Sequence, residues 1–433
     1  MTMLMWRLRS RSLGLLFGTM TALGVVMLTT RLPSWVGSWP ATGIIVQIAG
    51  VYLALVVAAA GAWAGGAESR YSTAEQLAAT AVSPWRRSTL ELSALAIASA
   101  GSYLAVSAVA VARTVGKAGP GLAIGAGYWL SGLLAMLLCL ALGWLLGRVL
   151  RGPVAVLVAV IAAFGTLQGP ETAPFALVDG DPQWTSDVRV LVLKIALVSA
   201  LLGVAIIMPA SSGPGRRTHA IRATAAVAAA AIVGGCIVVG APQVFREPVK
   251  PLCIEDRLTV CVWPEQRVHL SMVQEVVARA DRLPPEISFA QTNLWELGLR
   301  TRQVWEGDSV HFEHFIDGDW VATELGGGDG AAQVPAPFRL IDASPWSVAS
   351  EIASRASWEG DECAAGAESS IRLRAWVEAT LAGGGSPAYV MGGDPTMVEL
   401  RQQGMAMTDP SIPEPDRAAW ASEMAAHARL SCD

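Results

Sequence analysis

The stretch that decides the fold is AESRYSTAEQLAATAVSPWRR, residues 67–87, which separates two long apolar runs. Two overlapping capping boxes within it, Ser72 with Glu75 and Thr73 with Gln76, predict the start of a helix. A proline then ends the segment, and two arginines follow before the next apolar run begins. The stretch therefore predicts a short amphipathic helix between two membrane-crossing segments.

Composition indicates a membrane protein with a separate soluble part. Of the 433 residues, 53% are hydrophobic and 15% are charged, against about 25% charged in soluble domains. Residues 1–242 have a net charge of +9 and residues 243–433 a net charge of −14. This asymmetry predicts a transmembrane domain over 1–242 and an extracytoplasmic domain over 243–433. An acidic balance of this size argues against nucleic acid as a partner of the second domain.

Seven apolar runs approach the length of about 20 residues that a membrane-spanning helix needs. They cover residues 13–30, 44–64, 92–112, 122–147, 153–168, 190–209 and 223–241. The first run also fits a signal peptide, but its apolar stretch is long and no clean cleavage site follows, so we favour an uncleaved span.

The distribution of basic residues predicts the orientation of these spans. With the N-terminus in the cytoplasm, eleven arginines fall on the cytoplasmic side, and the acidic residues between 168 and 187 fall outside. Seven spans then place the C-terminal domain outside the cell. The sequence thus predicts a multi-pass protein of the plasma membrane with an inside N-terminus.

Two features of the spans leave alternatives open. Residues 168–187 contain two prolines and an apolar patch next to a short span, which fits either a re-entrant segment or an ordinary outside loop. Lys194 lies about one turn inside the sixth span, where we expect its amine to snorkel to the outer interface rather than line a translocation path.

The order of residues in 67–87 resembles the first cytoplasmic loop of ABC-2-type exporter permeases: mixed charges, a Thr-x-Glu-x-Leu helix, then a proline-bearing turn with arginines. In that family this loop is the coupling helix that docks on a nucleotide-binding subunit. The resemblance extends to the six-helix core and to the re-entrant element before the sixth span. It implies coupling roles for a set of residues in this loop: Glu68, Arg70, Thr73, Glu75, Gln76 and Leu77.

Four cysteines of the predicted outside domain indicate disulfides, since their number is even and the compartment is oxidising. Three pairings are possible. Cys253 and Cys261 flank a short alternating segment that suits a local bridge, which leaves Cys363 to pair with Cys432. Free thiols are the less favoured alternative.

The C-terminal domain has an α+β pattern. Expected elements are a strand at 258–263, a helix at 269–283, a hairpin of strands 310–316 and 319–324, and helices at 344–356, 370–381, 395–404 and 416–430. The segment Cys261-x-Trp263-Pro264-Glu265 resembles outside domains attached to actinobacterial ABC-2-type permeases, a similarity that implies no activity. Without that resemblance it is a strand that ends at the proline, with the tryptophan in the core.

No motif for chemistry stands out in the chain. A P-loop is absent, and His311-x-x-His314 would place its imidazoles on opposite faces of a strand, which disfavours a shared metal. The acidic cluster of Asp361, Glu362 and Glu368 fits a solvated loop better than a catalytic pair. We therefore expect no cofactor or metal in this chain.

The function that these observations favour is the permease subunit of an ABC exporter that moves a hydrophobic or amphipathic substrate. The resemblance implies ATP and Mg²⁺ on a separate ABC ATPase subunit, and a second permease copy or a related permease as a further partner in the lipid membrane. The alternatives are a membrane-anchored extracytoplasmic enzyme such as a hydrolase, and a sensor of an outside ligand. Seven spans exceed what an anchor needs, and the capped loop has no purpose in an enzyme.

Overall fold

The computed structural model describes residues 11–30, 35–70, 83–150, 152–168, 175, 183–208, 243–285, 287–289, 293–296, 299, 301–306, 309–316, 319–323, 336–338, 344–354, 356–357, 364–384 and 395–430. The chain forms two compact units. The membrane unit comprises 1–180 and 184–245, and the C-terminal unit comprises 181–183 and 246–433.

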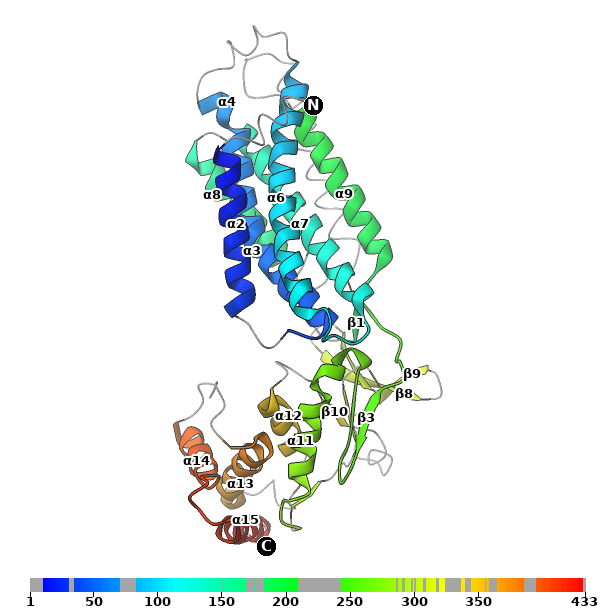
Figure 1. The fold of residues 1–433 in the computed structure, drawn as a ribbon, viewed down its shortest axis with the longest axis vertical. Helices are drawn as coiled ribbons and strands as arrows, with labels where there is room; N and C mark the ends of the chain where they lie inside the picture. The colour runs from blue at the N-terminus through cyan, green and yellow to red at the C-terminus, as the bar shows by residue number, and fades with distance from the viewer. Residues whose placement is uncertain are drawn as a thin grey trace. The chain divides into compact units, whose positions relative to one another are not determined.

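The membrane unit is a helical bundle (Figure 1). Its helices are α2 (Arg11–Thr30), α3 (Trp39–Gly65), α4 (Ala67–Arg70), α6 (Pro84–Thr114), α7 (Leu122–Val149), α8 (Pro153–Leu167) and α9 (Val188–Ile207). Five of these, α2, α3, α6, α7 and α9, are long and apolar enough to cross a membrane, whereas α8 has 15 residues. The protein is thus embedded in a membrane through mostly helical structure.

The first six predicted spans each lie on a described helix, including α8 for residues 153–168. The seventh, 223–241, lies outside the described residues. The seven-span count, the orientation and the ABC-2-like six-helix core therefore stay predictions.

Glycines set the closest helix pair of the bundle, α3 against α7. Gly61 and Gly65 of α3 face the backbone of Leu140 and Trp144 in α7. In return, Gly143 and Gly147 of α7 face the backbone of Ala58 and Ala62 in α3. A Cβ atom placed at Gly61 would lie 2.8 Å from the carbonyl oxygen of Leu140, so the two backbones touch here. Small residues at this spacing allow close approach of helices in a membrane. The two helices run parallel, because the residue numbers of the contacting positions rise in the same direction along α3 and α7.

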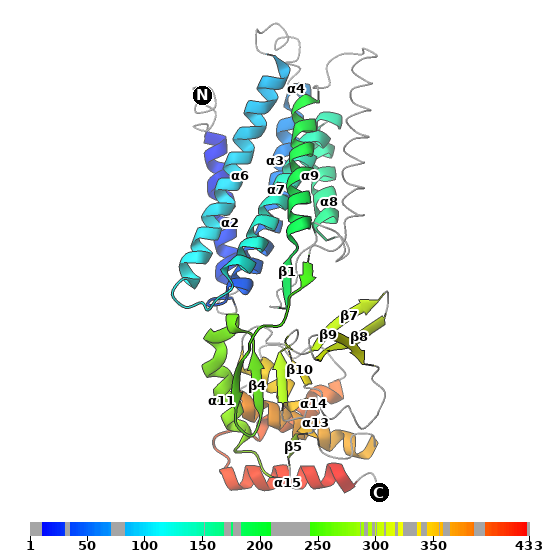
Figure 2. The same cartoon turned by 90° about the vertical axis from the view of Figure 1, so that its right-hand side faces the viewer.

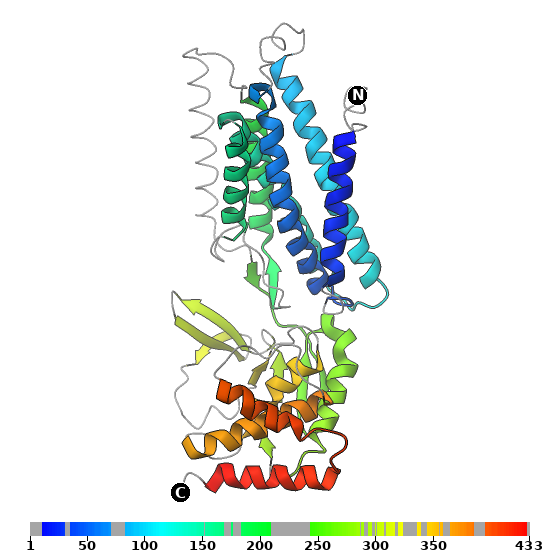
Figure 3. The ribbon, with the colours of Figure 1, turned by 90° about the vertical axis from the view of Figure 1, so that its left-hand side faces the viewer.

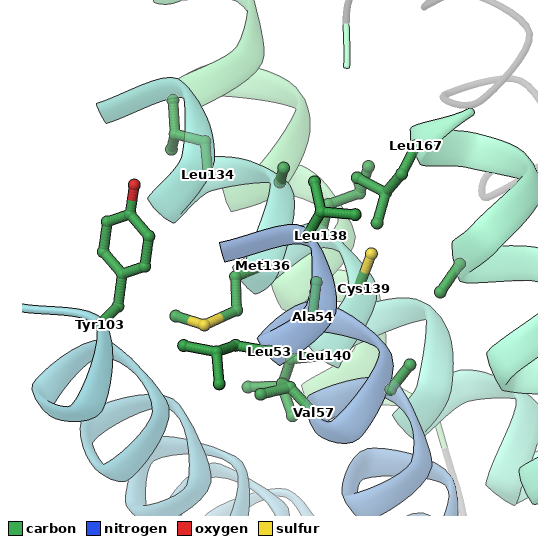
Figure 4. Close-up of a cluster of buried hydrophobic side chains, with 14 of the residues drawn as sticks. Leu53, Ala54, Val57, Tyr103, Leu134, Met136, Leu138, Cys139, Leu140 and Leu167 are labelled. Atoms are coloured by element: carbon green, nitrogen blue, oxygen red, sulfur yellow. The ribbon is translucent and has the colours of Figure 1, made fainter. Parts of the chain in front are cut away.

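Leucine, methionine and alanine side chains fill the centre of the bundle around this pair. Figure 4 shows Leu53, Val57, Met136 and Leu140 packed together, with Cys139 among them as a buried free thiol. These side chains are at most 1% exposed, so the bundle has a solid apolar core at this level.

A short antiparallel ribbon joins the end of the membrane unit to the start of α9. Strand β1 (Trp184–Ser186) pairs with β2 (Gln243–Phe245), and Trp184 stacks on Phe245 with ring centroids 4.0 Å apart. The hydroxyl of Tyr128 in α7 donates to the carbonyl of Trp184 at 2.9 Å. Figure 2 shows β1 leading directly into α9, whose N-cap is Asp187.

The C-terminal unit combines short strands with helices. A four-stranded sheet has the order β10 (Ala336–Phe338), β6 (Asn293–Glu296), β4 (Thr259–Val262), β3 (Leu252–Glu255). Strand β4 is antiparallel to β3 and parallel to β6, and the 3-10 helix η1 (Pro264–His269) and helix α11 (Leu270–Ala280) connect β4 toward β6. A second pair joins β5 (Ser288–Phe289) with β11 (Ala356–Ser357).

The predicted hairpin is present as β8 (Ser309–Ile316) antiparallel to β9 (Asp319–Thr323). A third strand, β7 (Thr301–Glu306), pairs with β8 and was not among the predicted elements. The remaining helices are α12 (Pro345–Ala353), α13 (Ala364–Ala382), α14 (Pro395–Ala406) and α15 (Glu414–Leu430). In Figure 3, α13 to α15 run from orange to red and lie together, and both α14 and α15 contact α13. Buried apolar side chains of α13 and α15 form one core with those of α11 and α12.

Candidate functional site

The predicted coupling segment is closed at its base by an ion pair. Glu68 in α4 and Arg87 in the first turn of α6 lie on opposite sides of residues 71–82, with Oε1 and Nη1 3.5 Å apart. Both side chains are partly shielded, at 22% and 16% exposed. The pair holds the two ends of the loop together, although 19 positions separate them in sequence.

Arg70 contacts the end of α3, and its coupling role stays a prediction. Its Nη2 donates to the carbonyl oxygen of Trp63 at 2.5 Å, and its guanidinium carbon lies 3.7 Å from the centroid of the Trp63 ring. Trp63 belongs to the last turn of α3, where carbonyl groups lack partners within the helix and a cation is stabilising. Arg70 thus caps α3 and stacks on Trp63, which remains 53% exposed.

The buried guanidinium of Arg148 connects three helices near the Glu68–Arg87 ion pair. It lies at the end of α7 with 6% exposure, over the Trp144 ring at 5.1 Å. Its Nη2 donates to Ser88 Oγ of α6 at 2.7 Å, and its Nη1 donates to the carbonyl of Met208 at the end of α9. The carboxylates of Glu68 and Glu91 also stabilise its charge.

We call Glu68, Arg70, Arg87, Ser88 and Arg148 the loop-base cluster. It gathers the end of α3, the start of α6 and the ends of α7 and α9. A buried guanidinium is costly unless its donors are satisfied, and here a hydroxyl and a carbonyl take two of them. These contacts connect the end of α7 to the start of α6 and to the end of α9.

The sequence predicts the loop but not this joint. Arg148 is one of the eleven arginines that predict the cytoplasmic side. The available signal was an arginine at the end of an apolar helix, which does not reveal a partner sixty residues away. The other predicted coupling residues, Thr73, Glu75, Gln76 and Leu77, lie outside the described residues, so their roles stay predictions.

Lys194 is buried in the bundle, which corrects the expectation that it snorkels to the interface. It is 2% exposed, and its Nζ donates to Ser131 Oγ of α7 at 2.6 Å. The centroid of the Phe175 ring lies 5.5 Å from the same nitrogen. Snorkelling requires a free path for the side chain, and the packing of α9 on α7 gives it a hydroxyl partner instead.

The Cys-x-Trp-Pro-Glu segment anchors the start of the C-terminal unit. Glu265 Oε1 lies 2.7 Å from Nη2 of Arg246, the first residue after β2, and the Arg246 guanidinium lies 4.7 Å from the Trp263 ring. Trp263 is fully buried, as expected, and its backbone N–H donates to Gln266 and Glu296. The segment therefore has a structural task that the sequence did not disclose.

The predicted disulfide between Cys253 and Cys261 is present and joins directly opposed residues of β3 and β4. Cys363 and Cys432 lie outside the described residues, so their pairing stays a prediction. The two histidines at 311 and 314 lie on β8. Among the residues that the structure describes, no group of three His, Cys, Asp or Glu side chains could hold a metal ion.

Comparison with known proteins gives no further guide: no protein-family model, no curated protein and no solved structure matches the chain.

Proposed function

We propose that this chain is the permease subunit of an ABC-type exporter, driven by a separate ATPase subunit that binds ATP and Mg²⁺. The loop-base cluster is the observation that carries the proposal. It closes the one segment whose sequence resembles a coupling helix and connects the base of that segment to four helices of the bundle. The proposed substrate is hydrophobic or amphipathic, and a second permease copy or a related permease completes the path.

The geometry supports a route by which a docked ATPase would act on the bundle. A displacement of residues 71–82 would be transmitted to α3 through α4, and to α6 through Arg87. From α6 it passes to α7 and α9 through Arg148, because the guanidinium contacts Ser88 and Met208 at once. Small displacements at one end of packed helices are carried along them as rigid-body shifts.

The C-terminal unit serves, in this proposal, as an extracytoplasmic lid, partner-binding module or substrate receiver. Its net charge would favour a cationic peptide or partner. Two of its buried carboxylates, Glu265 and Glu296, bind Arg246, Gln266 and the Trp263 backbone. Hydrolysis of a peptide, ester or glycan by the purified full chain would instead favour the alternative of a membrane-anchored enzyme.

Co-purification tests the proposal first. The tagged full chain, extracted in a mild detergent from its native cells, should bring down a P-loop ATPase whose ATP hydrolysis changes when the chain is bound. Failure to recover any P-loop ATPase under these conditions would contradict the transporter function.

Charge reversal then tests the loop base. Glu68→Lys and Arg87→Glu should each weaken the effect of the chain on ATP hydrolysis by up to about fivefold, and the double reversal should restore part of it. Arg86→Glu is the matched control, since Arg86 is the exposed neighbour of Arg87. Equal losses in the control and in Arg87→Glu would show that the ion pair has no part in coupling.

A further inference from the structure

The chain turns back on itself at the end of α3. The backbone N–H of Gly66, the C-cap of that helix, donates to the carbonyl of Ala62 at 3.1 Å, and the N–H of Arg70 donates to the carbonyl of Gly66 at 3.2 Å. Helix α4, which follows Gly66, has four residues. So short a helix is not stable by itself, and its direction depends on contacts with other elements.

Trp63 supplies one of these contacts. Its indole lies in the last turn of α3, and the guanidinium carbon of Arg70 lies 3.7 Å from the centroid of the ring. The same guanidinium donates through Nη2 to the Trp63 carbonyl oxygen at 2.5 Å. One residue of α3 thus holds the arginine at two points, with its side chain and with its backbone. Tryptophan is the aromatic residue that attracts a cation most strongly.

The ion pair of Glu68 with Arg87 is the second contact. Glu68 lies two residues before Arg70 in α4, and its Oε1 is 3.5 Å from Nη1 of Arg87 in the first turn of α6. Since an ion pair requires these atoms to lie within about 4 Å, a small rotation of α4 would separate the charges. Glu68 and Arg70 belong to one short helix, so a contact that holds Arg70 also presents Glu68 to Arg87.

The capping of α3 does not require the indole. The hydrogen bond from Arg70 uses only the backbone carbonyl at position 63, which any residue would offer. Packing in the core does not require it either, because Trp63 is 53% exposed. What the indole adds in this structure is the stack on the guanidinium.

We propose that Trp63 is a positioning residue of the loop base: by holding Arg70, it fixes α4 in the direction that lets Glu68 meet Arg87. This inference rests on the proposed function, because it names a further residue through which an ATPase docked on residues 71–82 would act on α3. The action of Trp63 is indirect and passes through Arg70.

Limited digestion of the full chain in detergent tests the contact without any ATPase. Trypsin cleaves after an arginine whose side chain enters its specificity pocket, so the stack should slow cleavage of the bond between Arg70 and Tyr71. Trp63→Leu should raise the rate of this cleavage about two- to fivefold, because cleavage follows the population in which the stack is open. Trp63→Tyr keeps an aromatic ring and should keep most of the protection.

Trp85→Leu is the matched control for the digestion. Trp85 is 54% exposed, as similar as the chain offers to Trp63, but it lies in the first turn of α6. Its replacement should leave the rate of cleavage after Arg70 unchanged. Equal rates in Trp63→Leu and in the wild type would overturn the proposal, and so would an equal rise in Trp63→Leu and Trp85→Leu.

The effect of the chain on ATP hydrolysis tests the positioning role. Trp63→Leu should weaken this effect about as much as Glu68→Lys does, and the two changes together should cost little more than either alone, because both break the same ion pair. Trp63→Tyr should restore most of the effect. The melting temperature of Trp63→Leu should stay close to that of the wild type, whereas a merely structural role would lower it together with the coupling.

The two measurements separate this inference from the proposed function. Full coupling in Trp63→Leu, with a P-loop ATPase recovered, would overturn the positioning role and leave the transporter function in place. Failure to recover an ATPase would contradict the transporter function, and the rates of cleavage after Arg70 would still decide whether Trp63 holds that arginine.

Discussion

At the scale of single residues, a few polar side chains do work that their sequence context hides. Arg148 lies in a leucine-rich helix end, yet it joins α6, α7 and α9 through two hydrogen bonds. Arg70 similarly binds the last turn of α3, and Arg246 binds Glu265. The positive-inside rule uses such arginines only as markers of topology, whereas in the structure they connect separate elements.

Replacing Arg148 should loosen the bundle. Arg148→Ala should lower the free energy of unfolding by about 1–3 kcal/mol, because Ser88 Oγ and the Met208 carbonyl lose a charged partner in a buried place. Arg113→Ala, at an exposed arginine of α6, is the control and should change stability by less than about 0.5 kcal/mol. Thermal unfolding in detergent measures both. Similar melting temperatures for the two variants would contradict the joint.

His269 should make the C-terminal unit sensitive to mild acid. It lies half-buried where η1 meets α11, and desolvation lowers the pKa of its imidazole below the ordinary value of 6.5. The unfolded chain therefore takes up a proton before the folded chain does. Stability is full above about pH 6.5 and falls as the pH drops through that value toward the folded pKa.

The His269→Gln variant should lose this pH dependence. Unfolding followed by tryptophan fluorescence between about pH 7 and about pH 5 measures the change. His427→Gln, at an imidazole that is 61% exposed, is the control and should keep the wild-type slope. A slope in His269→Gln as steep as that of the wild type would show that other groups cause the acid sensitivity.

At the scale of elements, glycine spacing decides how α3 and α7 meet. Gly143 faces the backbone of Ala58, and Gly147 faces that of Ala62. An added methyl group at either position has no space, since backbone atoms cannot move aside as a flexible side chain can. Glycine at these positions allows the close contact between the two helices, although glycine in a helix lowers stability through its conformational entropy.

A matched pair of alanine substitutions tests this contact. Gly143→Ala should destabilise the bundle by about 1–3 kcal/mol through overpacking. Gly203→Ala in α9 meets open space and should be neutral or stabilising by up to about 1 kcal/mol, because alanine favours the helix. Chemical or thermal unfolding in the same detergent compares the two. Equal effects would mean that α3 and α7 do not depend on close approach.

The long elements followed from the sequence, and the short ones did not. Apolar runs such as 44–64 and 122–147 carry enough consecutive residues to define α3 and α7. Strands β5, β6, β10 and β11 have two to four residues each, too few for alternation to show, and tertiary pairing decides them. The candidate site shows the same difference between local and distant signals. Local capping and charge patterns predict the loop, whereas Arg148 and Lys194 bind residues that are sixty or more positions away in the sequence.

At the scale of the whole molecule, the path of the chain bears on the topology. Helix α9 ends at Ile207, and Gln243 of β2 pairs with Ser186 at the opposite end of that helix. A helix of 20 residues is about 30 Å long, so the two ends of residues 209–242 are separated by about one bilayer core. This separation supports a return through the membrane, and with it the prediction of a seventh span.

Cysteine labelling tests this path. Single cysteines introduced as Ala220→Cys and Gly330→Cys, with an impermeant maleimide applied to intact cells, should differ: position 330 should react, and position 220 should react only after the cells are opened. Parallel samples without an introduced cysteine control for the native thiols. Reaction of both positions from outside would contradict the seven-span arrangement with an inside N-terminus.

The β1–β2 ribbon also restricts how the C-terminal unit can turn. The two units are joined there by two neighbouring peptide links, 183–184 and 245–246, and the N–H of Arg246 donates to the carbonyl of Gln183 at 2.8 Å across them. A single strand swivels about its own axis, whereas a paired ribbon resists torsion and bends more freely out of its plane. Rotation of the C-terminal unit would therefore twist β1, and with it the first turn of α9, which begins six residues before Lys194.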